Sequence, residues 1–413
     1  MRHQGEICVE EFFPRLRSDI EFIPLFIEGK KSIIVRDHLG LIKEPLLLWG
    51  EILDLISLLD GKHNLRDIQY ELVLSKKGVF ISSEEVMKII SELDAAFLLE
   101  SERYREAKKE IIIEYGKLKE RSAFHEGRAY PGNLKELRAY LDSILQSSST
   151  QNREEGKVMA LVAPHIDLEV GKKVYGKAYQ SIKNSKPRRI LLLGVGHNLH
   201  EYFFSLTEKD FRTLYGVVHS DREFIKELRK AGGSTVSQDD IVHRCEHSLE
   251  FQLLFLQHIF GSDFMIVPLL CGSFQKVLQQ VRRPADIEGV SEFLTLLRQW
   301  IEENPSETII VSGIDLSHIG PKFGHNQTAS SLLEQTKKHD KLLIESVLNL
   351  DLSRFWEMGK MGNNFYNVCG FSTLACLLEL LRDVKGHFLC YDIWQEERTK
   401  SAVSFAALVF YKR

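Results

Sequence analysis

The segments VMALVAPH (residues 158–165) and RRILLLGVGH (residues 188–197) decide the fold. Each is a continuous apolar run, rich in strand-forming residues, that ends at a histidine. Two later segments have the same apolar character, DFMIVPLLCG at 263–272 and ETIIVSGI at 307–314, and stretches with helical periodicity separate the four. Strands that lack strict polar–apolar alternation are buried on both faces. The sequence therefore predicts an α/β fold in which helices cover both faces of a sheet.

Side chains capable of acid–base or ligand chemistry directly follow three of these strands. His165 follows the first run, with Asp167 just beyond it, and His197 follows the second. Asp315 and His318 follow the run at 307–314. In open α/β sheets, ligands bind in the crevice outside the carboxyl ends of the strands. We therefore expect these side chains to converge at one edge of the sheet, although a single histidine in such a place is more often structural.

A fourth group lies in HRCEHSLEFQ, residues 243–252. His247 and Glu250 are three residues apart at the start of an amphipathic helix and so share a face. Glu246 is near the helix N-terminus, where its charge is favourable and where a capping role is equally consistent with the pattern. The segment also matches the H-x-x-E-H pattern of zinc peptidases, which requires one helix to carry both imidazoles. Because the helix is expected to begin near Glu246, His243 falls in the preceding loop and the peptidase is rejected.

Cys369 is the most conspicuous of the six cysteines, because Cys369-Gly370 immediately precedes an apolar helical stretch. A thiol at the positive end of a helix is favoured as the thiolate, which can act as a nucleophile or as a metal ligand. A buried, inert cysteine is equally consistent with the sequence. The six cysteines are scattered and include no C-x-x-C pair, so no disulfide framework is expected.

Composition excludes several classes of protein. The 413 residues are 44% hydrophobic and 27% charged, as in an ordinary globular protein, which excludes disordered, collagenous and coiled-coil chains. Lys+Arg 54 against Asp+Glu 58 gives a net charge of −4, too small to indicate a nucleic-acid or membrane-surface partner. No apolar run approaches the roughly 18 residues of a membrane-spanning helix, and the start lacks the apolar core of a secretory signal. We therefore expect a cytoplasmic protein.

The first hundred residues read as a separate α+β unit of winged-helix type. Two short strands are expected between residues 20 and 40, then three helices near 46–60, 64–75 and 83–96, and a closing strand at 96–104. Within this unit, LLDGKHNLRDI resembles the core of PqqD-like domains, and the resemblance implies a peptide or protein partner there. The predicted domains are 1–110 (winged-helix-like), 111–156 (helical connector that leads into the next domain) and 157–413 (α/β metal-binding domain).

Six motifs follow one another between residues 122 and 413: FHEGRAYPGNLKELRAYL, APH, LLGVGH, EHSLEFQ, DLSH and VCG. In this order they resemble the Memo family, which includes AmmeMemoRadiSam system protein B. That family is similar in fold to class III extradiol dioxygenases, which hold non-haem Fe(II) with two histidines and a carboxylate. In Memo proteins a cysteine takes the place of the carboxylate.

The resemblance implies roles for individual residues. His165, His197 and Cys369 would be the metal ligands, with Fe²⁺ favoured and copper or zinc compatible with the same donors. The predicted catalytic residues are His318, as an acid or base, together with Asp315 and His247; the residues expected around the pocket are Asp167, Glu246 and Glu250. The chain departs from the family pattern in having APHIDL for APHAGY and Asn198 after His197.

These observations support one leading hypothesis and two alternatives. The leading hypothesis is a Memo-family metalloprotein with a mononuclear iron or copper site, which carries out dioxygenase-like oxidoreductase chemistry on an unidentified substrate. The resemblance also implies a radical SAM enzyme and other proteins of the same pathway as partners. The alternatives are a non-catalytic protein that binds a partner or phosphopeptide and retains a vestigial metal site, and a zinc hydrolase that uses Glu246 or Asp315 as its base.

Overall fold

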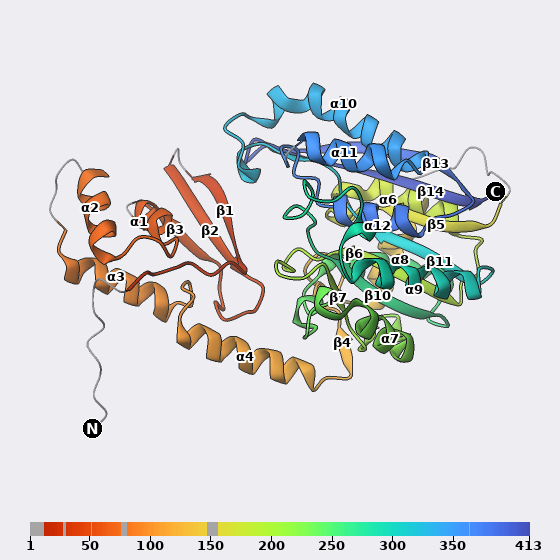
Figure 1. Ribbon diagram of the computed structural model, residues 1–413, viewed down its shortest axis with the longest axis horizontal. Helices are drawn as coiled ribbons and strands as arrows, with labels where there is room; N and C mark the ends of the chain where they lie inside the picture. Colours follow the sequence, from red (N-terminus) through yellow and green to blue (C-terminus); the bar gives the residue numbers. More distant parts are fainter. Residues whose placement is uncertain (1–11, 28–29, 51, 76–80, 147–155, 363) are drawn as a thin grey trace. The chain divides into compact units, whose positions relative to one another are not determined.

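The computed structural model describes residues 12–27, 30–50, 52–75, 81–146, 156–362 and 364–413. The chain divides into two compact units, Met1–Tyr115 and Gly116–Arg413 (Figure 1). Each unit has hydrophobic cores of its own. Among the helices of the described residues, none combines the length and apolar character that crossing a membrane requires.

The first unit is a small antiparallel sheet followed by helices. Its strands pair in the order β1-β2-β3, with bounds Ile20–Ile27, Lys30–Asp37 and Leu46–Trp49. Its helices are α1 (Ile52–Leu58), α2 (Leu65–Ser75), α3 (Ser83–Ala95) and α4 (Glu102–Gly116), the last of which ends at the unit boundary. Buried residues of the sheet and of α1, α2 and α3 form one core.

Two predictions for this unit were wrong. Residues 46–49 form strand β3 and not the start of a helix, because Gly50 at φ 69° turns the chain before α1 begins. No closing strand spans 96–104: Leu99 forms only an isolated bridge with Leu16, and α4 begins at Glu102. The apolar pair Leu98 and Leu99 is buried in the core, which explains the strand-like pattern.

The second unit is built on a mixed sheet of eleven strands. At its centre β5 (Val158–Ala163), β11 (Thr308–Gly313), β6 (Arg189–Val195) and β10 (Met265–Cys271) are neighbours in that order and run parallel. On the β5 side, β14 (Ser401–Lys412) pairs antiparallel with β5. It also pairs antiparallel with β12 (His318–Ile319) and β13 (Val384–Glu396). On the other side follow β9 (Gly216–Ser220), β8 (Asp210–Thr213) and β4 (Glu120–Ser122), while β7 (Phe204–Leu206) also pairs with β10.

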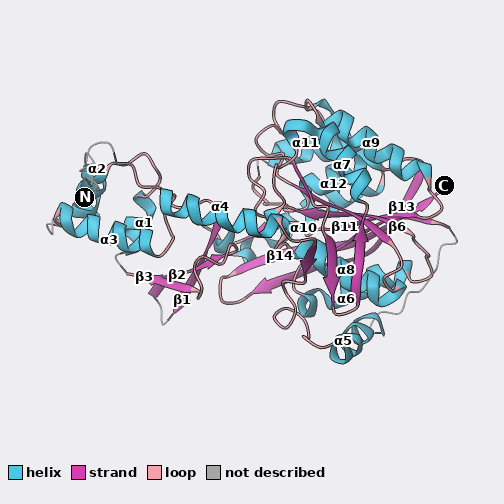
Figure 2. Ribbon diagram, turned by 90° about the horizontal axis from the view of Figure 1, so that it is seen from below, coloured by secondary structure: helices cyan, strands magenta, loops and turns pink. Residues whose placement is uncertain are grey.

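Helices cover both faces of this sheet, as predicted (Figure 2). Alternate residues of each central strand enter opposite cores: Ala160 and Val162 face one core, whereas Leu161 and Ala163 face the other. The first core packs against α7 (Arg222–Gly232), α9 (Val290–Glu303), α10 (Ala329–Leu348), α11 (Leu352–Gly362) and α12 (Phe371–Leu380). The second core packs against α5 (Leu134–Gln146), α6 (Leu168–Ile182) and α8 (His247–Phe260).

The first turn of α8 packs directly on two central strands. A Cβ added to Gly194 of β6 would lie 2.5 Å from the Ser248 hydroxyl oxygen, and one added to Gly313 of β11 would lie 2.2 Å from the Ser248 carbonyl oxygen. Real Cβ atoms do not approach other atoms so closely, so these positions require glycine. The contact places Glu246 and His247 beside the carboxyl ends of the strands.

Phe255 provides a test of the core between α6 and α8. Its fully buried ring stacks on Tyr175 and Tyr179, with ring centroids 5.1 and 4.4 Å apart. Phe255→Ala should lower the free energy of unfolding by about 3–5 kcal/mol, measured by denaturant titration, because it leaves a cavity between two rings. Phe388→Ala is the control, since this ring is 52% exposed and its loss should change stability by only about 0.5 kcal/mol. Equal losses in the two variants would contradict this description of the core.

Candidate metal centre

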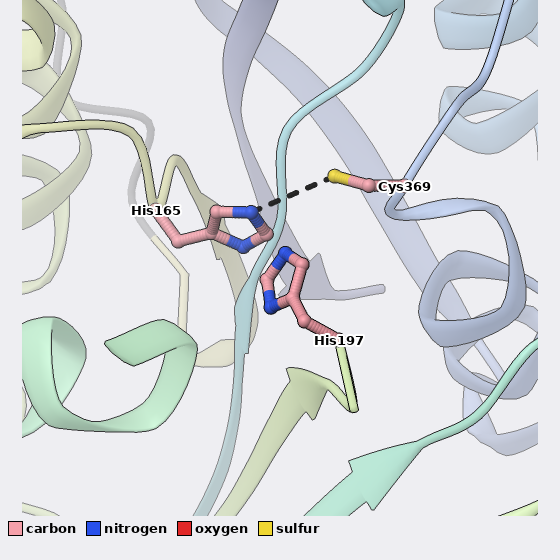
Figure 3. A group of neighbouring side chains, drawn as sticks. All are labelled: His165, His197 and Cys369. Atoms are coloured by element: carbon pink, nitrogen blue, oxygen red, sulfur yellow. Dashed lines mark hydrogen bonds between the residues drawn. The ribbon is translucent and has the colours of Figure 1, made fainter. Parts of the chain in front are cut away.

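Three potential metal-binding side chains from distant parts of the sequence meet at the carboxyl edge of the sheet (Figure 3). His165 follows β5, His197 follows β6, and Cys369 precedes α12. One ligand atom of each lies within 4.8 Å of the others, and Cys369 Sγ lies 3.5 Å from His165 Nε2. Because β11 alone separates β5 from β6, the strand ends that carry the two histidines are close together.

Hydrogen bonds orient both imidazoles so that Nε2 is available as a ligand atom. His165 Nδ1 lies 3.0 Å from the carbonyl oxygen of Gly313, which can only accept, so the proton sits on Nδ1. His197 Nδ1 lies 3.0 and 3.1 Å from the two carboxylate oxygens of Glu246. Metal-binding histidines in proteins commonly donate their other ring N–H in this way, which fixes the tautomer and the ring orientation.

Glu246 accepts hydrogen bonds from both the backbone and the side chain of His197. Its buried carboxylate accepts from the backbone N–H groups of His197 and Ser248, at 3.2 and 2.9 Å, and is the N-cap of α8. Burial alone would raise the pKa of this carboxyl, but the charges of His197 and His247 and these donors hold it well below its usual range. Glu246 therefore both caps α8 and lies beside the pocket, the two roles that the sequence predicted for it.

The surroundings favour a thiolate at Cys369. Burial alone would raise the pKa of its thiol, but the charges of His165 and His318, with hydrogen bonds from His165 and His197, lower that pKa to about 6. Burial opposes protonation of His165, yet Asp315 and Cys369 outweigh it and raise the pKa of His165 to about 9. Cys369 is therefore mostly ionised at neutral pH, the form in which sulfur binds metals.

Asp315, two residues after the end of β11, contacts both the end of β5 and the loop that carries Cys369. Its Oδ1 accepts from the backbone N–H groups of His165 and Ile166, at 3.0 and 3.3 Å, and Oδ2 lies 3.7 Å from His165 Nε2. Its backbone carbonyl accepts from the N–H of Gly370 at 3.1 Å, and the thiol sulfur of Cys369 lies 3.5 Å from the same oxygen. Asp315 thus links the end of β5 to the loop that carries the cysteine.

The structure also brings His247 to the centre, with a neighbour that sequence reasoning missed. The His247 ring stacks on His197 with centroids 4.8 Å apart, and meets His165 edge-on at 5.1 Å. Burial, together with the positive charges of the other imidazoles, lowers the pKa of His247 well below its usual value. His125 approaches His247 at 5.8 Å, and its Nε2 lies 2.9 Å from the carbonyl oxygen of Cys245. The motif FHEGRAY was the only sequence signal for His125.

His318 lies on β12, where it pairs with Val403 of β14. Its Nδ1 is 3.0 Å from the carbonyl oxygen of Leu316, which can only accept, so Nδ1 carries a proton. Its backbone N–H donates to the carbonyl of Tyr366 at 2.8 Å. The charge of His318 is one of the causes that lower the pKa of Cys369.

Glu250 is fully buried and bound to the segment that enters the second unit. Its carboxylate pairs with Arg121 at 2.5 Å, accepts from the backbone N–H groups of Phe124 and His125 at 2.9 Å each, and accepts from the Tyr130 hydroxyl at 2.6 Å. The structure therefore gives Glu250 the role of attaching β4 and the following loop to α8.

Asp167 and His243 lie outside the cluster. Asp167 is exposed, and its Oδ1 accepts from the backbone N–H groups of Glu169 and Val170, which makes it the N-cap of α6. His243 ends a short 3₁₀ turn, and α8 begins only at His247. As the sequence predicted, the two imidazoles of H-x-x-E-H therefore do not lie on one helix.

A cleft with a cavity volume of about 280 Å³ leads to the centre. Its lining includes His197 and Cys369, and 34% of the His197 side chain is exposed. His165 is only 2% exposed and does not line the cleft. A small molecule would therefore reach the cluster from the side of His197 and Cys369.

Comparison with known proteins agrees with the sequence motifs. The family model described as Memo-like protein matches residues 121–409. The chain belongs to this family. All the histidines and the cysteine of the cluster lie in the matched region of this Memo-like protein.

Relatives extend the match beyond that region. A MEMO1 family protein of Aquifex aeolicus is 31% identical over 401 residues, 96% of this chain and 100% of its own length. One of Thermus thermophilus is 29% identical over 347 residues, 84% of this chain and 98% of its own length. One of Methanococcoides burtonii is 23% identical over 257 residues, 62% of this chain and 85% of its own length. The alignment with the Aquifex protein is too long for Gly116–Arg413 alone and so includes the first unit.

Two buried carboxylates, Glu246 at the N-cap of α8 and Glu250 in its first turn, give a matched test of the site. Glu246→Gln should weaken metal binding by about 10–100-fold, measured by competitive chelator titration, because the His197 ring loses the group that orients it. Glu250→Gln should leave metal affinity unchanged but lower the free energy of unfolding by about 3–5 kcal/mol, because the Arg121 charge loses its buried partner. Equal losses of metal affinity in the two variants would show that helix stability, and not the His197 contact, controls the site.

Proposed function

We propose that this Memo-like protein holds one metal ion through His165 Nε2, His197 Nε2 and Cys369 Sγ. The observation that carries the proposal is the convergence of these donors within 4.8 Å, with both imidazole protons bound on the far nitrogens. Two imidazoles and a thiolate form a donor set that transition metals accept. A metal held by three protein donors supplies open coordination positions and charge for redox or Lewis-acid chemistry.

Among the metals that fit these donors, we favour iron. Zinc accepts the same donors in a tetrahedral site, and a soft thiolate also suits copper. The likeness of Memo proteins to extradiol dioxygenases favours non-haem Fe²⁺ and dioxygenase-like oxidoreductase chemistry, an argument from fold analogy. The substrate cleft would then be the one that His197 and Cys369 line.

The surrounding residues can supply proton transfer and orientation. We assign His318 as the acid or base, because the Leu316 carbonyl holds its Nδ1–H and Nε2 is then the ring nitrogen left to exchange a proton. Asp315 positions His165 through the backbone and so acts on the metal ligand without being one. His247, whose pKa is lowered, stays neutral at pH 7 and can accept a hydrogen bond.

A hydrolase that uses Glu246 or Asp315 as its base fits the contacts less well. Both carboxylates already accept from N–H groups: Glu246 from His197 and Ser248, and Asp315 from the end of β5. A base needs a lone pair directed at the water it activates. Oxygen consumption by the metal-loaded protein would separate the oxidoreductase from the non-catalytic binding protein. A radical SAM enzyme as pathway partner, and a peptide partner for the first unit, stay predictions of the family resemblances.

Cys369→Ser is the direct test of the metal site. Full-length protein purified without oxygen should contain one metal ion per chain by mass spectrometry. The variant should bind that metal at least about tenfold more weakly, because loss of a ligand costs more than changes in the groups around it. It should also lose any thiolate-to-metal absorption of the copper(II) or iron(III) form. Unchanged affinity and spectrum would overturn the ligand assignment and favour Cys369 as a nucleophile.

His318→Ala tests the division between ligand and acid–base residue. The variant should retain the metal content of the wild-type protein, because His318 is outside the group of converging ligand atoms. Any oxygen-consuming turnover should fall by about 100-fold or more, the usual contribution of a positioned acid or base. His318→Gln, which keeps a polar side chain, should not restore it. A metal-free His318→Ala protein would instead make this histidine a ligand.

A further inference from the structure

Apart from the proposed metal ligands His197 and Cys369, the described residues that line the cleft have side chains without a permanent charge. Of the described residues that line it, none is a lysine, arginine, aspartate or glutamate. Its polar groups are amides, hydroxyls and imidazoles, such as Gln275, Ser273 and His339. Phosphates and carboxylates are generally bound in proteins by guanidinium or ammonium groups. The composition of these walls therefore disfavours an anionic ligand, including a phosphopeptide.

Charges near the cleft are already engaged with the protein. Asp340, behind His339, is fully buried and accepts from the hydroxyls of Ser317 and Tyr391, at 2.5 and 2.7 Å. The Lys276 ammonium donates to the carbonyl of His200, a lining residue, at 3.1 Å. Neither charge belongs to the lining, so neither is presented to a ligand inside the cleft.

Flat rings form one wall of the cleft. The imidazole of His339 stacks on Tyr366 with centroids 3.9 Å apart and planes 17° from parallel. Phe365 meets Tyr366 edge-on at 5.0 Å, and Phe371 lines the cleft at the start of α12. Aromatic side chains attract other rings by stacking or edge-to-face contact. This wall favours a planar ligand.

The loop that carries this wall is held in place beside the centre. Asn364 and Asn367 have positive φ angles of 61° and 44°, a conformation that costs energy for residues other than glycine. The side-chain amide of Asn367 donates to the carbonyls of His318 and Phe323, at 3.3 and 3.1 Å. The Tyr366 carbonyl accepts from the N–H of His318. The aromatic wall is therefore formed before any ligand arrives.

The charge of the metal-loaded centre acts in the same direction. A bound divalent metal would deprotonate the Cys369 thiol, so that this thiolate and the buried carboxylates of Asp315 and Glu246 would carry three negative charges against the two positive charges of the metal. This step rests on the proposed metal site, whereas the wall composition does not depend on it. An anion would meet repulsion from the centre and no cation in the walls.

We infer that the cleft binds an uncharged small molecule that carries an aromatic ring. The ring lies against the Tyr366 wall, and a neutral hydrogen-bonding group, such as a hydroxyl or a carboxamide, meets the amide and imidazole side chains. This names the substrate class of the proposed oxidoreductase site. The same cleft would accept such a ligand if the protein only bound it.

Four matched probes test the inference on the full-length protein, both metal-free and loaded with redox-inert zinc. They are 4-hydroxybenzamide (neutral aromatic), 4-hydroxybenzoate (anionic), 4-hydroxybenzamidine (cationic) and trans-4-hydroxycyclohexanecarboxamide (neutral, saturated). Saturation-transfer NMR titration should give a millimolar dissociation constant for 4-hydroxybenzamide and binding at least about threefold weaker for the saturated amide. The anion should bind about tenfold more weakly or not at all, because no described lining residue is a lysine or arginine and the centre repels it. The cation should also bind more weakly than the neutral amide, because no described lining residue is an aspartate or glutamate that could pair with it. Tighter binding of either ion, equal binding of the saturated amide, or no binding of 4-hydroxybenzamide would overturn the inference.

Variants locate the binding and separate it from the metal site. Tyr366→Leu should weaken 4-hydroxybenzamide binding by about threefold to tenfold while zinc affinity stays unchanged; Phe388→Leu, at an exposed ring outside the cleft, should change neither. Gln275→Lys, at a half-buried lining position, should raise the affinity for 4-hydroxybenzoate. A wild-type protein that does not bind zinc would reject the metal proposal alone. Unchanged affinity of Tyr366→Leu for 4-hydroxybenzamide, or of Gln275→Lys for 4-hydroxybenzoate, would reject this inference alone.

Discussion

The close packing of α8 on β6 and β11 is the constraint on which the centre depends. Gly194 and Gly313 leave no side chain between the helix and the sheet, so the first turn of α8 lies against the strand ends. Only at this distance does Glu246 reach both the backbone and the ring of His197. The direction of His197 Nε2, and with it the arrangement of the donor atoms, therefore depends on the absence of a Cβ at Gly194 and Gly313.

Buried charge is the second feature that organises the site. An isolated carboxylate or thiolate in the interior is costly, and each is stable here only because N–H donors and imidazoles surround it. Glu246 and Cys369 are separated by His197, which lies in contact with both. The alternation of acidic and basic groups lets the apo-protein keep a thiolate at neutral pH, and it leaves protons on histidines that a metal would displace.

The sequence was most informative where chemistry and secondary structure coincide. Four apolar runs predicted the central strands, and the residues that follow them predicted the convergence of His165, His197 and Asp315, because parallel strands end at the same edge. The part played by His125 could not be seen, since its contact with His247 joins positions far apart in sequence. Asp167 was expected beside the pocket because it lies two residues after His165, but its side chain is exposed and caps α6. Near residue 46, an apolar pattern typical of either a strand or a helix was decided by the turn at Gly50.

The ion pair of Arg121 with Glu250 has a consequence for how such chains can be assembled from modules. The family model begins at residue 121, so the region that it describes starts at the partner of a buried charge. A chain that began after Arg121 would leave the buried carboxylate of Glu250 on α8 without its positive partner. What precedes β4 is free of that requirement. Different leading domains can therefore be joined to the same Memo-like region during evolution, provided that the junction falls before this arginine.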